Sequence, residues 1–241
     1  MDLTRYAVMG CKRSGHHAIA YWVMLQIPGG AVFHNDCNGR LEAARLQVIG
    51  EGKHSLHLLE DFDLCGWSGL DLQDHFDRPI LVLRDGYNWA ASVVRSNMGR
   101  KATWEPYRRI QIRTHERDMK WFGGTLGRLD TWKQHVSRAL DGVLPKNALV
   151  VNYNKWCADE EYRKELSTCL GLPFNDIGRR LVPPFGHGSS FDKMKFDGHA
   201  EDMETLTRWE TMKGDPEWKL MVDKEVRHLT REYFGYTPNT N

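Results

Sequence analysis

The chain has 241 residues, of which 41% are hydrophobic and 27% are charged, and its formal net charge at neutral pH is +1. This length and composition predict one large α/β domain over residues 1–241 with a well-buried core. They exclude a disordered chain and a protein that coats nucleic acid through bulk charge, and they leave room for a local basic pocket.

The apolar runs and the cysteines indicate a reducing, cytoplasmic compartment. The longest apolar runs are far too short to span a bilayer, and residues 1–10 lack the basic start and apolar stretch of a signal peptide. The five cysteines are odd in number and form no C-x-x-C pair, so they suggest neither a disulfide framework nor a zinc ribbon. We therefore expect a cytoplasmic protein without a membrane partner.

The first third of the chain has the pattern of a strand, a loop and a helix, followed by two more strands. Residues 5–10 (RYAVMG) are apolar and end in glycine, and residues 17–26 repeat apolar side chains at helical spacing. Pro and Gly punctuate the next stretch, which holds a predicted short strand at 31–33. A further buried strand is expected at 54–62.

Residues 78–96 form the clearest unit of the sequence. Their β-branched and leucine-rich run predicts a strand that ends at Arg84. Asp85 can cap the helix that follows, in which NWAASVVRS has helical spacing.

The remaining segments continue the alternation of strands and helices. Helices broken near Gly123-Gly124 are expected over 107–140, and their charges indicate a solvated face or, alternatively, a basic surface for an acceptor. The other predicted elements are a strand at 147–156, a helix at 159–173, a loop at 182–198 and a terminal helix at 216–234. The alternation predicts a three-layer α/β fold, with a mostly parallel sheet covered by helices on both faces.

The loop after the first strand has the glycine spacing of a phosphate-binding loop. Gly10 and Gly15 permit the backbone angles of an anion cradle at a helix N-terminus, and the basic pair at 12–13 adds charge. Histidines at 16–17 replace the Lys and the Ser or Thr of a nucleoside triphosphatase. The sequence therefore predicts phosphate binding without metal-assisted triphosphate hydrolysis. The alternative is a plain strand-to-helix turn with a positive cap.

A second signal follows the strand that ends at Arg84. Ligands bind at the carboxyl ends of strands in open α/β sheets, and Ser92 lies eight residues further on. An Arg-Ser-Gly loop followed by this Arg–Ser pair resembles the sulfotransferases that use 3′-phosphoadenosine 5′-phosphosulfate (PAPS). The stretch 149–173 is similar to the family's later strand, turn and helix that ends in Leu-Gly-Leu-Pro. The resemblance covers residues 5–175.

The resemblance implies a P-loop NTPase-like sulfotransferase fold and PAPS as the sulfuryl donor, with no metal. It implies that the first loop holds the 5′-phosphosulfate and that Arg84 and Ser92 hold the 3′-phosphate. The cofactor-binding residues expected from it, including those that stand in for missing family residues, are Lys12, Arg13, Ser14, Gly15, His16, His17, Arg84, Ser92, Tyr153, Ser189 and Ser190.

Three departures from the family pattern concern the nucleotide. The two threonines after the family's Ser-Gly are histidines here, and the tryptophan that often stacks on adenine is Ala18. Another aromatic residue must take that place, and the sequence does not identify it. The C-terminal Arg-Lys-Gly clamp is absent, and Ser189, Ser190 and Lys193 lie in a similar place and offer donors.

Sulfuryl transfer needs an in-line acceptor, a base, and positive charge on the departing phosphate oxygen. The resemblance assigns the charge to Arg13. For the base it leaves three alternatives open: His57, Glu60, or the pair His34 and Asp36.

These features predict a PAPS-dependent sulfotransferase that acts on a hydroxyl or amine of a small-molecule or carbohydrate acceptor. A P-loop kinase-like phosphotransferase is one alternative, and a catalytically inactive nucleotide-binding module of the same fold is another. The sequence identifies neither the acceptor nor the oligomeric state, and it predicts no nucleic-acid partner.

Overall fold

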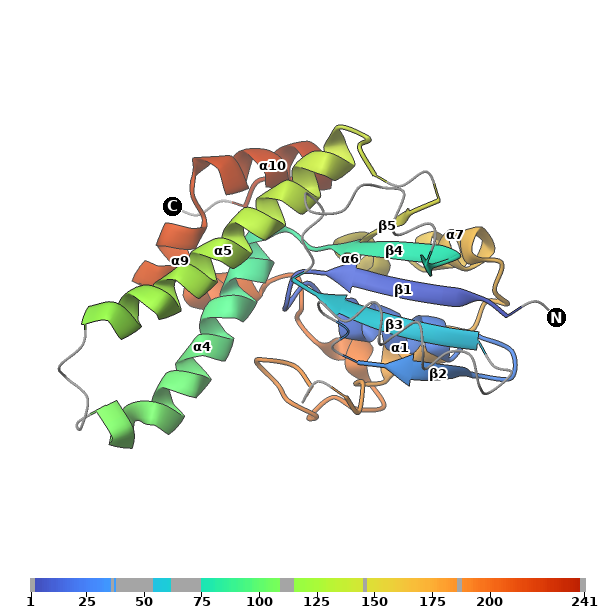
Figure 1. Ribbon diagram of the computed structural model, residues 1–241, viewed down its shortest axis with the longest axis horizontal. Helices are drawn as coiled ribbons and strands as arrows, with labels where there is room; N and C mark the ends of the chain where they lie inside the picture. Colours follow the sequence, from blue (N-terminus) through green and yellow to red (C-terminus); the bar gives the residue numbers. More distant parts are fainter. Residues whose placement is uncertain are drawn as a thin grey trace.

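A five-stranded parallel sheet of order β2-β3-β1-β4-β5 forms the centre of the molecule (Figure 1). The computed structural model describes residues 3–35, 37, 54–61, 75–108, 115–144, 147–185 and 188–238, with side chains except at 98–126. The strands are β1 (Arg5–Gly10), β2 (Ala31–His34), β3 (His54–Glu60), β4 (Arg78–Leu83) and β5 (Leu149–Asn152). The predicted mostly parallel sheet is therefore confirmed.

Helices cover both faces of the sheet, as expected for three layers. One face carries α1 (His16–Met24), α6 (Tyr153–Ala158) and α7 (Glu160–Leu170), and α8 (Ile177–Arg180) packs on α1. The other face carries α4 (Gly86–Arg108), α5 (His115–Leu140), α9 (Pro216–Met221) and α10 (Lys224–Phe234). Two short 3₁₀ helices, η2 (Ala200–Asp202) and η3 (Arg208–Met212), lie between α8 and α9 in the chain. Figure 1 shows α4 and α5 extending past the carboxyl ends of the strands.

The strands are apolar on both sides because each side faces its own core. Val8 and Leu58 join the core under α1, which contains Trp22. Met9 and Leu59, their neighbours along β1 and β3, join the core under α4 and α5. Alternate residues of a strand point to opposite faces, so a strand buried on both sides appears as a nearly continuous apolar run.

Two predicted element ends lie within one to three residues of the observed ones. β4 ends at Leu83, so Arg84 follows the carboxyl end of the strand, and Asp85 accepts a 2.9 Å hydrogen bond from the backbone N–H of Asn88 and caps α4. Gly171 ends α7 in the left-handed conformation. Within the described residues, no helix has both the length and the apolar character needed to cross a bilayer.

Three predicted elements are wrong at their boundaries. α5 runs unbroken through Gly123 and Gly124, because a helix-interior glycine costs only about 1 kcal/mol and a long helix tolerates it. The strand predicted at 147–156 ends at Asn152, whose side chain accepts a hydrogen bond from the backbone N–H of Lys155 and starts α6. The terminal helix predicted at 216–234 is two helices, α9 and α10, of which Asp223 caps the second.

Candidate functional site

The loop of residues 10–15, hereafter the cradle, joins β1 to α1 and requires both of its glycines. Gly15 has a φ of 91°, and a Cβ there would lie 2.2 Å from the ring of Tyr153. A Cβ on Gly10 would lie 2.6 Å from Ser14 Oγ. Arg13 also has a positive φ, 74°, which is a strained conformation for a residue with a side chain. The cradle therefore turns sharply and leads into the N-terminus of α1, where backbone N–H groups attract anions.

Hydrogen bonds from three other segments fix the backbone of the cradle. The indole Nε1–H of Trp89 donates to the carbonyl of Lys12 over 2.9 Å, and Arg84 Nη1 donates to the carbonyl of Arg13 over 3.3 Å. The backbone N–H of Lys12 donates to Asp61 Oδ1 over 2.7 Å. These bonds hold the cradle in place before any ligand binds.

The predicted pair of Arg84 and Ser92 is brought together beside the cradle. Arg84 Nη1 donates to Ser92 Oγ over 2.9 Å, and Nη2 donates to the carbonyl of Thr205 over 2.6 Å. Arg84 is only 3% exposed, and its guanidinium lies 5.4 Å from the centre of the Tyr153 ring. Among the described residues, its Nε–H has no hydrogen-bond partner. The pair therefore includes a buried N–H donor for which the described residues offer no acceptor.

A cavity of about 350 Å³ opens above the cradle, and most of the predicted site residues line it. The predicted residues in its lining are Lys12, Arg13, Gly15, His16, His17, Glu60, Ser92, Tyr153, Ser189 and Ser190. Ser14 and Arg84 lie behind this wall, where they contact the lining residues His16 and Ser92. Within the described residues the lining does not include Lys193. The structure therefore gathers the cradle and the Arg–Ser pair around one space.

Arg208 and Arg179 also line this cavity, and the sequence analysis missed both. Arg208 Nη2 donates to Ser189 Oγ and to Asp192 Oδ2, each over 2.8 Å. Burial and, next, the charge of Arg84 lower the pKa of Arg208, although a guanidinium remains charged at any working pH. Arg208 therefore adds a positive charge to the cavity wall, paired with Asp192 at 2.8 Å. No local motif marks Arg208, which lies in η3, far along the chain from the cradle.

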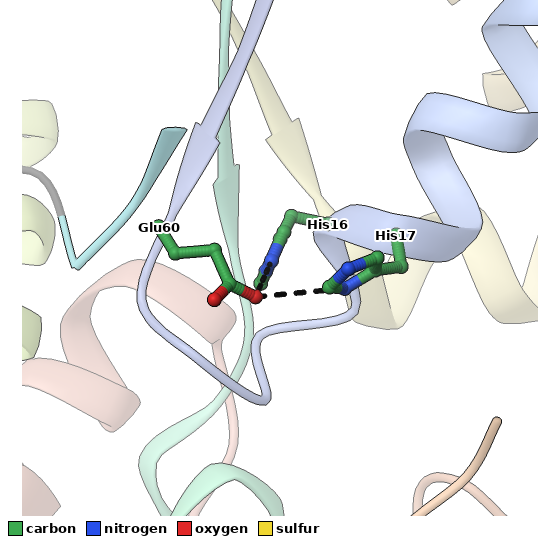
Figure 2. A group of neighbouring side chains, drawn as sticks. All are labelled: His16, His17 and Glu60. Carbon is green, nitrogen blue, oxygen red and sulfur yellow. Dashed lines mark hydrogen bonds and ion pairs between the residues drawn. The ribbon is translucent and has the colours of Figure 1, made fainter. Parts of the chain in front are cut away.

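Glu60 is the predicted base that the structure places on the cavity wall. It ends β3, and the sheet register pairs it with Gly10 of the cradle. Its carboxylate lies 2.9 Å from His16 Nε2, 3.2 Å from Lys12 Nζ and 3.7 Å from His17 Nδ1. Figure 2 shows both histidines, from the start of α1, turned toward this carboxylate. Burial would raise the pKa of Glu60, but His16, His17 and Lys12 together lower it to about 2. Glu60 is therefore ionised at neutral pH.

The structure places the other predicted bases elsewhere. His57 pairs with Ala7 in the middle of the sheet, and it faces the core under α4 and α5, opposite to Glu60. His57 Nε2 lies 3.1 Å from Ser55 Oγ, and its ring stacks on His34 with 4.5 Å between centroids. Among the described residues, the cavity lining includes neither His57 nor His34. Asp36 lies outside the described residues.

Three aromatic side chains line the cavity close to Ala18, which stands where the family has tryptophan. Tyr153 packs on Gly15 and stacks on Trp156, with 5.6 Å between ring centroids. Phe185 is half-buried and stacks on Phe33 at 4.1 Å. The rings of Tyr153, Trp156 and Phe185 form the flat, apolar part of the wall.

His16, His17 and Glu60 could also hold a metal ion, since one ligand atom from each lies within 4.8 Å of the others. Two imidazoles and a carboxylate are a donor set that zinc uses. Here, however, the same carboxylate binds the Lys12 ammonium, and both ring nitrogens of His16 lie within hydrogen-bond distance of Glu60 and Ser14. A cation would have to displace His16 and sit beside Lys12. The charges of this wall therefore favour an anion.

No protein-family model matches the chain, and no curated protein matches its sequence. The function must therefore be inferred from the residues of the site.

Proposed function

We propose that the chain is a sulfotransferase that moves a sulfuryl group from PAPS to a hydroxyl or amine of a small-molecule or carbohydrate acceptor. The observation that carries the proposal is the position of Arg84, whose Nη1 binds both the carbonyl of Arg13 and the hydroxyl of Ser92. This group links the cradle to Ser92, which lines the same cavity. PAPS carries two separate anionic groups, the 5′-phosphosulfate and the 3′-phosphate, which such a pair of elements suits.

Each half of the nucleotide has a set of donors in this proposal. The backbone N–H groups where the cradle enters α1, with the side chains of Lys12 and Arg13, bind the 5′-phosphosulfate. Ser92 and Arg208 on the wall, with Arg84 behind them, bind the 3′-phosphate. An unpaired buried donor costs about 1–3 kcal/mol, so the Nε–H of Arg84 gains from an anionic acceptor. Arg208 takes the place of the C-terminal clamp that the sequence lacks.

Glu60 accepts the proton of the acceptor in the proposed reaction. The acceptor oxygen or nitrogen attacks sulfur, its proton passes to the Glu60 carboxylate, and the bond between sulfur and the 5′-phosphate oxygen breaks. The electron pair of that bond remains on the phosphate oxygen, where the Arg13 guanidinium stabilises the charge. The products are the sulfated acceptor and 3′,5′-phosphoadenosine. The place of Glu60 on the cavity wall, beside the cradle, supports this role.

A ligand panel tests the proposal against its rivals. Calorimetry with 3′,5′-phosphoadenosine, AMP and ATP with Mg²⁺ should give the tightest binding for the first. Transfer of ³⁵S from labelled PAPS to a panel of phenols, amines and sugars then separates an enzyme from an inactive binding module. Transfer should persist in excess EDTA. If chelation abolished turnover and Mg²⁺ restored it, the phosphotransferase would be favoured instead, as it would by preferential binding of ATP with Mg²⁺.

A further inference from the structure

A chain of two hydrogen bonds passes through the imidazole of His16. Its Nδ1 lies 3.1 Å from Ser14 Oγ, and its Nε2 lies 2.9 Å from Glu60 Oε1. An ionised carboxylate only accepts hydrogen bonds, so Nε2 must carry the proton and donate it to Glu60. In the neutral ring, Nδ1 then accepts from the Ser14 hydroxyl. The side chain is 1% exposed and is held from both sides.

The local backbone places His16 where it can make both contacts. His16 is the first residue of α1, directly after the sharp turn at Gly15. The absence of a side chain on Gly10 leaves room for the pair, because a Cβ there would lie 2.6 Å from Ser14 Oγ and 3.4 Å from the Cβ of His16. The sheet register brings Glu60 beside Gly10. The sheet register therefore fixes the backbone position of Glu60, and the contact with His16 orients its carboxylate.

The three basic groups around Glu60 differ in how firmly they are held. Lys12 Nζ reaches Oε2 over 3.2 Å from a flexible stem, and that side chain is 33% exposed. His17 Nδ1 is 3.7 Å from Oε1, which is too long for a strong hydrogen bond. His16 is both the closest partner and the most buried. Asp61, the next residue, turns to Lys12 N–H and Arg128 instead.

We propose that His16 is a positioning residue that aims the Glu60 carboxylate at the acceptor and keeps it ready to take the acceptor's proton. The catalytic part of this inference rests on the proposed function. The contact between His16 and Glu60 rests on the hydrogen-bond geometry. His16 touches none of the reacting atoms. It stands where a triphosphatase has its phosphate-binding lysine, and its two ring nitrogens contact Ser14 and Glu60.

Two substitutions test the link. His16→Leu keeps most of the volume but removes both hydrogen bonds, and misplacing the base should lower kcat about a hundredfold. His16→Gln can still donate from its amide nitrogen to Glu60 and should restore part of the rate. Affinity for 3′,5′-phosphoadenosine should change little in both variants. The matched control is His228→Gln on the exposed surface of α10, which should leave all readouts unchanged.

The pH profile separates positioning from a merely structural role. Without His16, burial raises the pKa of Glu60, and of its neighbours Lys12 and His17 only Lys12 carries a charge near neutral pH. The acid limb of kcat/KM against pH should therefore move up by about one unit or more in His16→Leu, since one lost charge-assisted hydrogen bond is equivalent to that shift. A ¹³C NMR titration of the Glu60 carboxyl, assigned by difference from Glu60→Gln, should show the same rise without any turnover.

An unchanged Glu60 pKa and acid limb in folded His16→Leu would overturn the positioning role. If His16→Leu does not fold, His16→Gln is compared with His16→Asn, whose shorter amide reaches toward Ser14 but not Glu60. Gln should then have the higher kcat and the lower Glu60 pKa, and equal values would overturn the link. If the wild type binds 3′,5′-phosphoadenosine but transfers no sulfuryl group, the proposed function fails with the catalytic role. If the Glu60 titration in His16→Leu matches that of the wild type, only the positioning role of His16 is rejected and the proposed function stands.

Discussion

The carboxylate of Asp61 accepts a 2.7 Å hydrogen bond from the backbone N–H of Lys12, and this bond ties the end of β3 to the cradle. The second oxygen of Asp61 accepts a 3.1 Å hydrogen bond from Arg128 Nε of α5. Asp61 has a φ of 50°, a left-handed conformation that Asp and Asn tolerate better than most residues. The side chain of Asp61 therefore links β3, the cradle and α5, and it is one of three that hold the loop proposed to bind the phosphosulfate.

Replacing Asp61 should loosen the cradle. Asp61→Ala removes the acceptor and leaves alanine in a left-handed conformation, so the free energy of unfolding should fall by about 1–3 kcal/mol. Asp61→Asn keeps one acceptor oxygen and tolerates the backbone, and it serves as the matched control with a smaller loss. Urea denaturation and calorimetry with 3′,5′-phosphoadenosine measure both effects. Wild-type stability and affinity in Asp61→Ala would show that this bond does not hold the cradle.

The 3′-phosphate should be recognised at Arg84 and Ser92. Arg84→Ala should weaken binding of 3′,5′-phosphoadenosine by roughly tenfold to a hundredfold, because a charge-assisted hydrogen bond is lost, and should affect AMP much less. Arg84 also binds the carbonyls of Arg13 and Thr205, so thermal unfolding of the variant must be measured alongside.

Ser92→Ala is the milder companion, because it removes only a hydroxyl on the cavity wall. It should weaken the binding of 3′,5′-phosphoadenosine by roughly threefold to tenfold. Arg231→Ala, on the exposed face of α10, controls for loss of a positive charge elsewhere. If the wild type bound 3′,5′-phosphoadenosine and AMP equally well, Arg84 and Ser92 would not be the site of the 3′-phosphate.

The cradle and the Arg–Ser pair were predictable because their signals are local. Gly10 and Gly15 are required by backbone geometry within the loop itself, and Arg84 follows a strand whose apolar run marks its end. The alternation of strands and helices likewise gave the parallel sheet. A strand's apolar run does not show where the next helix starts, however, so the start of α6 at Tyr153 was missed.

The choice among the bases depended on contacts that no local pattern records. His57 and Glu60 lie in one strand, and only their opposite faces, set by the cores on each side, put Glu60 on the cavity. Arg208 is far from the cradle in sequence and reaches the site through the packing of η3 on α4. The contacts of His16 and His17 with Glu60 were missed for the same reason, and both residues still line the cavity.

Arg13 should act mainly in the transition state, where charge builds on the oxygen between sulfur and the 5′-phosphate. Its Nη2 donates to Ser96 Oγ of α4 over 2.6 Å, and its side chain lines the cavity. Arg13→Ala should lower kcat by about 10² or more, the effect of losing one preorganised charge-stabilising donor. Nucleotide affinity should fall much less, because Lys12 and the backbone N–H groups remain.

Two further variants separate the charge of Arg13 from the strain of its backbone. Arg13→Lys keeps a point charge and should retain part of the activity. Arg13→Gly loses the charge but relieves the positive φ, so it should be as slow as Arg13→Ala and more stable in thermal unfolding. If Arg13→Ala lost affinity but kept kcat at saturation, Arg13 would be a binding residue only.

The buried His57 should make the protein less stable as the pH falls below neutrality. Burial and the neighbouring His34 lower the pKa of His57 to about 4, whereas in the unfolded chain it is near its ordinary value of 6.5. Between these pH values the unfolded chain binds a proton that the folded protein does not, so the free energy of unfolding decreases as the pH falls from about 6.5 to 4. The full effect is on the order of 3 kcal/mol.

Urea denaturation at pH 7.5 and pH 5 measures this dependence. His57→Gln removes the titrating group while keeping a polar side chain near Ser55, so the loss of stability between the two pH values should be smaller than in the wild type. Part of the dependence will remain, because burial also lowers the pKa of His17, to about 3. His228→Gln, on the exposed surface of α10, should behave as the wild type does. If His57→Gln kept the full pH dependence, the neutral buried imidazole would not be its source, and His17 would be the next group to replace.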